Sequence, residues 1–124
     1  MARILVIDDD NELRALLRLA LEMAGHQVLE ASDGRQGIKA FSQQAADLIL
    51  CDIIMPDKEG LETIRELRRR FPDVKIVAMS GGAFGGKWDF LPLAMKFGAA
   101  RILKKPFDVG ALTLVIDELL QSTN

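Results

Sequence analysis

The chain lacks the features on which several protein classes depend. Its 124 residues include a single cysteine, which cannot form an internal disulfide, so a reducing compartment is expected, namely the cytoplasm. No apolar stretch approaches the roughly 20 residues of a membrane span, and the N-terminus does not resemble a signal peptide. Positive charge is not in excess, because the net charge is -2. We therefore expect neither a membrane nor a nucleic acid as a partner.

What remains is the composition of one ordinary globular domain. Apolar residues make up 49% of the chain and charged residues 27%, and no segment has the low complexity of a linker. A chain of this length can bury a hydrophobic core but has no room for a second one. We expect a single domain over residues 1–124.

Four short apolar runs each end on charged or hydroxyl residues. They are Ile4–Ile7 before Asp8 and Asp9, Leu48–Cys51 before Asp52, Ile76–Met79 before Ser80, and Ile102–Leu103 before Lys104 and Lys105. Such runs are typical of strands that are buried on both faces of a parallel sheet. Because ligands bind at the carboxyl ends of the strands in open α/β sheets, we expect these polar residues to meet at one edge.

The segments between the runs have the apolar spacing, caps and stops of helices. The predicted helices contain Leu13–Leu21 before Gly25, residues up to about Gln43 after the N-cap Asp33, Leu61–Leu67 before Phe71, about Lys87–Phe97 before Gly98, and Leu112–Leu120 after the N-cap Asp108. Gln27–Ala31 supplies a further strand, so strand and helix alternate five times, which implies parallel strands. The strands that carry charge, Gln27–Ala31 and Arg101–Lys104, suit the edges of the sheet. The prediction is an α/β fold: a doubly wound, flavodoxin-like sheet of order 2-1-3-4-5 with five helices.

The predicted sheet brings three carboxylates close together, those of Asp8, Asp9 and Asp52. Two like charges about 4 Å apart repel by roughly 4 kcal/mol at an effective dielectric constant near 20. The cluster therefore needs a cation or a proton, and an oxygen-only ligand set favours Mg²⁺, with Mn²⁺ as the alternative. Mg²⁺ readily adds a phosphate oxygen to its ligands, so the predicted chemistry is phosphoryl transfer.

Asp52 is the predicted nucleophile, because it ends a central strand and carboxylates form acyl-phosphate intermediates. Lys105 supplies an ammonium group that can neutralise the transferred group, and the Ser80 hydroxyl can donate a hydrogen bond to it. An isolated Asp8-Asp9-Asp10 triplet would be read as a helix cap, and we assign only Asp10 to that role.

The same segments carry a combined signature that spans essentially the whole chain. They are residues 4–9 (ILVIDD), 48–60 (LILCDIIMPDKEG), 76–81 (IVAMSG) and 98–107 (GAARILKKPF). In their order and approximate spacing they resemble the response-regulator receiver domain, the phospho-acceptor module of two-component signalling, and in particular stand-alone receivers similar to the chemotaxis regulator.

The resemblance implies a Mg²⁺-dependent phospho-acceptor that alters protein–protein binding and is not otherwise an enzyme. Asp52 would take a phosphoryl group from a sensor histidine kinase or a histidine phosphotransfer protein. Asp9, Asp52 and the backbone carbonyl of Ile54 would ligate the ion, with Asp8 acting largely through water. The downstream partner stays open, as does the choice between a monomer and a weak dimer.

The resemblance also implies a conformational switch that depends on Ser80 and on an aromatic residue three positions before Lys105. Here that position holds Ile102, which has no ring to turn between solvent and core. We therefore expect either that a shorter-range packing change carries the signal or that the output uses another surface. The glycine-rich segment 81–88 is longer than is common in the family, and we expect it to be mobile. Ile54 and Gly82 offer no polar side chain to orient an attacking water, so we expect slow self-dephosphorylation.

Other readings stay open from the residues alone. Asp8 and Asp10 resemble the nucleophile and acid–base pair of haloacid-dehalogenase phosphohydrolases, but that reading leaves Asp52 without a role. A flavin-binding protein of the same topology would need a Ser/Thr-rich phosphate loop where the acidic residues stand. The chain also suits a receiver excised from a longer protein.

Overall fold

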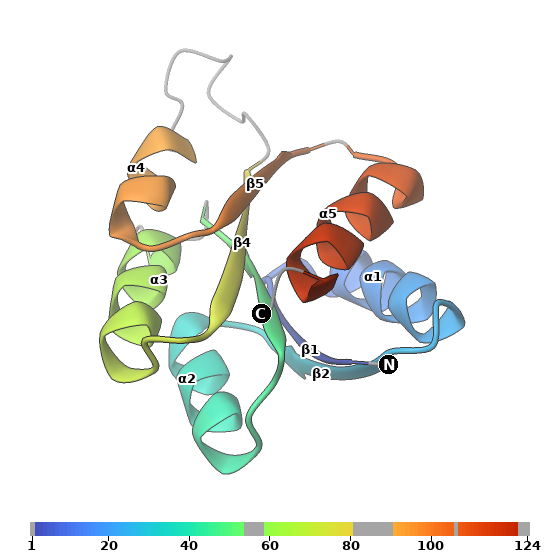
Figure 1. Ribbon diagram of the computed structural model, residues 1–124. Coiled ribbons are helices and arrows are strands. Elements are labelled where there is room, and N and C mark those ends of the chain that lie inside the picture. The colour runs from blue at the N-terminus through green and yellow to red at the C-terminus, as the bar shows by residue number, and fades with distance from the viewer. Residues whose placement is uncertain (1, 54–58, 81–90, 106, 122–124) are drawn as a thin grey trace.

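The computed structural model describes residues 2–53, 59–80, 91–105 and 107–121, which form a single sheet with helices on both faces (Figure 1). Three expectations fall outside these ranges. They are the start of the fourth helix near Lys87, the glycine-rich segment 81–88 and the backbone carbonyl of Ile54.

Five parallel strands form the sheet, in the predicted order β2-β1-β3-β4-β5. The strands are β1 (Arg3–Ile7), β2 (Gln27–Ala31), β3 (Leu48–Asp52), β4 (Lys75–Ser80) and β5 (Arg101–Lys104). The three apolar strands are central and the two charged strands lie at the edges, because an edge strand leaves part of its surface in contact with water. In the register, Ile7 pairs with Cys51 and Ser80 pairs with Lys104, so the strands end close to one another.

Five helices connect the strands and cover the sheet. They are α1 (Asn11–Met23), α2 (Gly34–Gln43), α3 (Glu59–Arg70), α4 (Leu91–Phe97) and α5 (Val109–Gln121). Helices α1 and α5 lie on one face, and α2, α3 and α4 lie on the other (Figure 1). Each face has its own apolar cluster: Leu5, Ile7 and Ile49 point toward α2–α4, whereas Ile4, Val6 and Leu50 point toward α1 and α5. This alternation is what a strand buried on both faces requires.

Local sequence signals set the helix ends. The carboxylate of Asp10 accepts the N–H groups of Glu12 and Leu13, and the predicted cap Asp33 accepts that of Gln36. Gly25, just beyond α1, has a φ of 93°, a left-handed conformation that favours glycine. These signals fix where α1 and α2 begin and where α1 ends.

Burial on α1 divides its apolar residues unevenly. Leu17 and Leu21 are buried, whereas Leu16 is 60% exposed although it has the same helical spacing.

At the end of the chain, Asp108 accepts a hydrogen bond from the N–H of Ala111 at 2.7 Å and caps α5 as predicted. The α5 residues Leu112, Val115, Ile116 and Leu119 are all buried.

Candidate functional site

The three carboxylates that the sequence predicted to converge do lie together. Asp8 and Asp9 directly follow β1, and Asp52 is the last residue of β3, its neighbour in the sheet. One carboxylate oxygen from each of these residues lies within 4.8 Å of the others. Because parallel strands end at the same edge, residues distant in sequence become neighbours here.

The three acids differ in their exposure to water. Asp8 is fully buried and Asp52 is 4% exposed, whereas Asp9 is exposed. Ionised carboxylates this close repel one another, by about 4 kcal/mol for a pair 4 Å apart at an effective dielectric constant of 20. The site therefore has two shielded acids at its base and a third, open to solvent, at its entrance.

The ammonium group of Lys105 lies against both shielded acids. Its Nζ is 3.0 Å from Asp8 Oδ2 and 3.4 Å from Asp52 Oδ2. Burial by itself lowers the pKa of Lys105, but the attraction of Asp52 and Asp8 outweighs it, so the pKa is raised overall. Lys105 thus stays charged at neutral pH and neutralises one of the three carboxylates.

Backbone hydrogen bonds hold the loop between β1 and α1. The N–H of Asp8 donates to the carbonyl of Ala31 at 3.1 Å, and Asp8 Oδ1 accepts the N–H of Asp10 at 2.9 Å. Nη1 of Arg14, on the first turns of α1, donates to the carbonyl oxygen of Asp8 at 2.8 Å. The Asp8 main chain and side chain are therefore fixed by β2, by the turn and by α1.

Ser80 and Ile102 lie where the sequence places them. Ser80 is the last residue of β4 and is 3% exposed, and its carbonyl accepts the N–H of Lys105 at 2.7 Å. This bond ties the residue after β5 to the end of β4 beside the acids. Ile102 pairs with Ala78 and is half-buried against the cluster under α2–α4.

Helix α3 packs unusually closely on the end of β3. A Cβ atom added to Gly60 would lie 2.3 Å from both the carbonyl oxygen of Asp52 and the Cα of Ile53. Only glycine permits this approach of the helix to the backbone of the site. Gly60 therefore sets how close α3 comes to Asp52.

Three residues near the site were missed by the sequence reasoning: Arg14, Glu30 and Gly60. In the sequence, Glu30 served only as a charged residue that indicates an edge strand. In the structure, its Oε1 accepts a hydrogen bond from Nε of Arg14 at 2.9 Å. The helical position of Arg14, four residues after the cap Asp10, was the one available signal. Nothing in the sequence pattern predicts that its side chain turns back to the loop.

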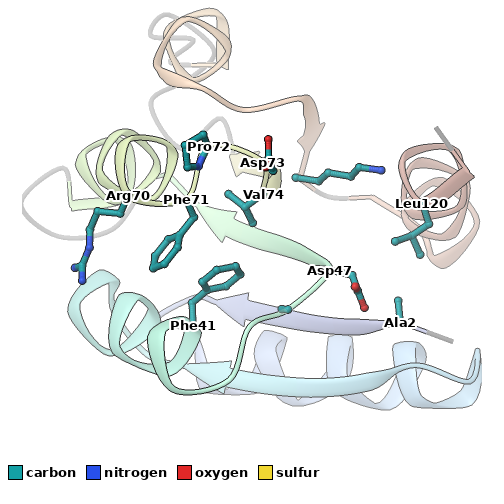
Figure 2. Close-up of a pocket in the computed structure, with 11 residues that line it drawn as sticks. Ala2, Phe41, Asp47, Arg70, Phe71, Pro72, Asp73, Val74 and Leu120 are labelled. Carbon is teal, nitrogen blue, oxygen red and sulfur yellow. The ribbon is translucent and has the colours of Figure 1, made fainter. Parts of the chain in front are cut away.

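A pocket of about 730 Å³ lies at the opposite, amino-terminal edge of the sheet (Figure 2). The rings of Phe41 and Phe71 are in contact there, with centroids 4.6 Å apart and planes tilted by 53°. Two of its charged groups have structural contacts: Asp47 accepts a hydrogen bond from the N–H of Arg3, and Lys75 donates one to the carbonyl of Leu119 near the end of α5. The residues Asp8, Asp9, Asp52 and Lys105, which we call the acidic site, do not line this pocket, so the pocket is separate from the candidate site.

The donor set suits a hard divalent cation. It consists of carboxylate oxygens, which Mg²⁺ and Mn²⁺ prefer. One ammonium group against three carboxylates leaves an excess of two negative charges, which such an ion would balance. The fold and the site together define a doubly wound α/β protein with a cluster of three carboxylates and one ammonium group at the carboxyl ends of its strands.

Comparison with known proteins assigns this class to one family. The family model "Response regulator receiver domain" matches residues 4–117, and the chain belongs to that family. The transcriptional regulatory protein CpxR of Klebsiella pneumoniae is 37% identical over 124 residues, which cover 100% of this chain and 51% of CpxR. The response regulator receiver protein CpdR of Brucella abortus is 32% identical, with 97% of this chain and 98% of CpdR covered.

Solved structures show the same architecture. The receiver domain of NtrX from Brucella abortus superimposes with a TM-score of 0.88 at 28% identity, over 97% of this chain and 99% of that domain. The chain thus spans about half the length of the CpxR relatives and nearly all of CpdR. No helix within the described ranges is long and apolar enough to cross a bilayer.

Proposed function

We propose that this receiver is a Mg²⁺-dependent phospho-acceptor in which Asp52 takes a phosphoryl group from a phosphohistidine. The observation that carries the proposal is the meeting of Asp8, Asp9, Asp52 and the Lys105 ammonium group at one edge of the sheet. Membership of the receiver family supports the same reading. The proposed domain extends over residues 1–124.

Asp9 and Asp52 would hold the ion directly with the backbone carbonyl of Ile54, and Asp8 would act largely through bound water. When bound, Mg²⁺ (or Mn²⁺) supplies positive charge that neutralises the oxygens of the incoming phosphoryl group. The exposure of Asp9 leaves the site open on the side from which ion and donor enter. The nearly buried Asp52 carboxylate has little freedom to turn, which favours attack in a fixed direction.

Lys105 and Ser80 would bind the phosphoryl oxygens. As the bond from the Asp52 oxygen to phosphorus forms, the bond from phosphorus to the donor's histidine nitrogen breaks and the imidazole leaves. The ammonium group of Lys105, already 3.4 Å from Asp52, stabilises the negative charge on the transferred group. Ser80, at the end of β4, would donate its hydroxyl to the same group.

Phosphorylation would act as a population shift between two conformations that bind partners differently. Ser80 and Ile102 are the proposed switch residues, since Ile102 is half-buried beside α4 and its packing can respond to β4.

The proposed donor is a sensor histidine kinase or a histidine phosphotransfer protein in the cytoplasm. The output is binding to a further protein by a monomer or a weak dimer, and the domain catalyses only its own phosphorylation and dephosphorylation.

The test uses a small phosphodonor, acetyl phosphate, with and without Mg²⁺, and intact-mass measurement of the product. Wild type should gain one phosphoryl group only with Mg²⁺, Asp52→Asn should gain none, and Asp10→Asn, outside the proposed site, should behave as wild type. Phosphate on Asp8, together with turnover of p-nitrophenyl phosphate, would instead favour the phosphohydrolase reading and refute the proposal.

A further inference from the structure

Arg14 joins the acidic site to a charged network on the neighbouring edge strand. Its Nη1 donates to the carbonyl oxygen of Asp8 at 2.8 Å, and its Nε donates to Glu30 Oε1 at 2.9 Å. The side chain of Arg14 is 16% exposed and that of Glu30 is 26% exposed. A guanidinium group is planar and rigid, so it holds two acceptors at fixed positions relative to each other.

The carboxylate of Glu30 is itself held from a second side. Its Oε2 accepts Nη1 of Arg18 at 2.6 Å, and Nε of Arg18 donates to Glu22 at 3.1 Å. Glu30 therefore lies between two arginines of α1, one of which reaches the acidic site and one of which does not. This difference supplies a matched pair of residues for an experiment.

The carbonyl that Arg14 holds belongs to the peptide bond between Asp8 and Asp9. The N–H of Asp8 is bound to the carbonyl of Ala31, and the Asp8 side chain accepts the N–H of Asp10. Because Arg14 also holds the Asp8 carbonyl, the plane of the peptide bond between Asp8 and Asp9 is fixed. Rotation of this plane would swing Asp9, the exposed member of the three acids, away from Asp8 and Asp52.

We propose that Arg14 is a positioning residue of the acidic site, which fixes the Asp8–Asp9 peptide and thereby holds the Asp9 carboxylate in place for a divalent cation. The inference rests on the proposed function, in which Asp9 ligates Mg²⁺. Substitution of a residue that orients a metal ligand through a hydrogen bond commonly lowers metal affinity by about 10- to 100-fold.

The sign of the effect separates positioning from simple electrostatics. Arg14 is a positive charge near an acidic cluster, so Coulomb's law alone makes Mg²⁺ bind more tightly when that charge is removed. Loss of positioning makes Mg²⁺ bind more weakly. The two explanations predict opposite changes in the dissociation constant for the same substitution.

The experiment measures Mg²⁺ binding to the whole chain by isothermal titration calorimetry, for wild type, Arg14→Met and the control Arg18→Met. We expect affinity to fall about tenfold in Arg14→Met. Arg18→Met removes the same charge and a contact to the same Glu30 but no contact to Asp8, so its affinity should equal that of wild type or rise slightly. Circular dichroism establishes that each variant is folded at the titration temperature.

A second comparison tests whether Arg14 acts through Asp9. In an Asp9→Asn background, Arg14→Met should change affinity by less than about twofold, because residues that act in one chain of contacts are not additive. A tenfold loss in both backgrounds would contradict the route through Asp9.

Two results would overturn the inference while leaving the proposed function intact: wild-type affinity or tighter binding in Arg14→Met, or equal losses in Arg14→Met and Arg18→Met. Wild type that binds no Mg²⁺ would refute the proposed function and the inference together. If Arg14→Met does not fold, Arg14→Gln replaces it with the same outcomes, since its uncharged, shorter side chain cannot span Asp8 and Glu30.

Discussion

At the scale of single residues, the ammonium group of Lys105 lies between two carboxylates that are almost completely shielded from water. Its distances to Asp8 and Asp52 are 3.0 and 3.4 Å. A buried carboxylate without a partner is strongly destabilising, because it has lost its hydration and gained nothing in exchange. Lys105 is therefore expected to stabilise the fold as well as to take part in the proposed reaction.

We expect Lys105→Met to destabilise the metal-free protein by about 2 kcal/mol, less than the 3–5 kcal/mol typical of fully buried pairs, because Lys105 is 20% exposed. Adding Asp8→Asn should recover part of this loss, since it removes the charge of the carboxylate that Lys105 approaches at 3.0 Å. Urea denaturation in a chelator, over a double-mutant cycle, measures the coupling, which should be about 1–2 kcal/mol. Lys96→Met, on the exposed side of α4, is the control. Additive effects of the two substitutions would show that the ion pair contributes nothing to stability.

At the scale of whole elements, α1 and β2 are joined by charge as well as by apolar packing. Glu30 on β2 binds Arg18 and Arg14 on α1, and hydrogen bonds from Arg18 above all lower the pKa of Glu30 below its ordinary 4.5, against the opposing effect of burial. A carboxyl group whose pKa is lower in the folded state adds stability above its unfolded pKa. That stability is lost as the pH falls through the folded pKa.

Glu30→Gln should therefore destabilise the protein by about 1–2 kcal/mol at pH 7, as expected for a partly buried, hydrogen-bonded pair. The difference from wild type should shrink as the pH falls below 4.5 and disappear once Glu30 is protonated in the folded state. Denaturant unfolding between pH 7 and pH 3 measures it. The control is Glu66→Gln. Its partner Arg70 lies four residues further along α3, both side chains are more than 40% exposed, and stability should change by less than about 0.5 kcal/mol. A difference that persists unchanged into acid would contradict the ionic explanation.

The contact between α3 and β3 makes a second prediction at this scale. In an exposed helix, Gly→Ala stabilises by about 1 kcal/mol, yet Gly60→Ala should destabilise by about 2 kcal/mol or more. The reason is that the new Cβ would meet backbone atoms of Asp52 and Ile53 at 2.3 Å, and backbone cannot move aside cheaply. Gly110→Ala on α5 is the matched control, because its Cβ would meet only Asp108 Oδ1 at 3.3 Å; its stability should change by less than about 1 kcal/mol. Thermal unfolding of both variants decides, and equal effects would show that the close approach is not important.

At the scale of the whole molecule, the sequence predicted the sheet order and the convergence of the acids for one physical reason. Doubly buried strands must be apolar throughout, so the point where each strand meets solvent is visible as the first charged or hydroxyl residue, such as Asp8 or Asp52. The family resemblance then supplied expected roles, which remain proposals. The contacts of Arg14 and the close approach of Gly60 could not be predicted, because they depend on side-chain direction and helix-to-strand distance. The pattern of residues along the sequence determines neither the direction of a side chain nor the distance between a helix and a strand.

The excess negative charge of the acidic site gives a last prediction for the stability of the whole domain. Without divalent ions, Asp9→Asn should stabilise the protein by about 1 kcal/mol, the repulsion expected between charges some 4 Å apart near water. With Mg²⁺ the order should reverse, because an ion bound only to the folded state adds about 2.7 kcal/mol at 100 times its dissociation constant, and Asp9→Asn loses a ligand. Melting temperatures of the two proteins, measured from chelator to millimolar Mg²⁺, should therefore cross. Curves that stay parallel would mean either that no ion binds among these carboxylates or that Asp9 is not one of its ligands. Asp52→Asn distinguishes the two explanations, because it should abolish the dependence of the melting temperature on Mg²⁺ only if the ion binds at this site.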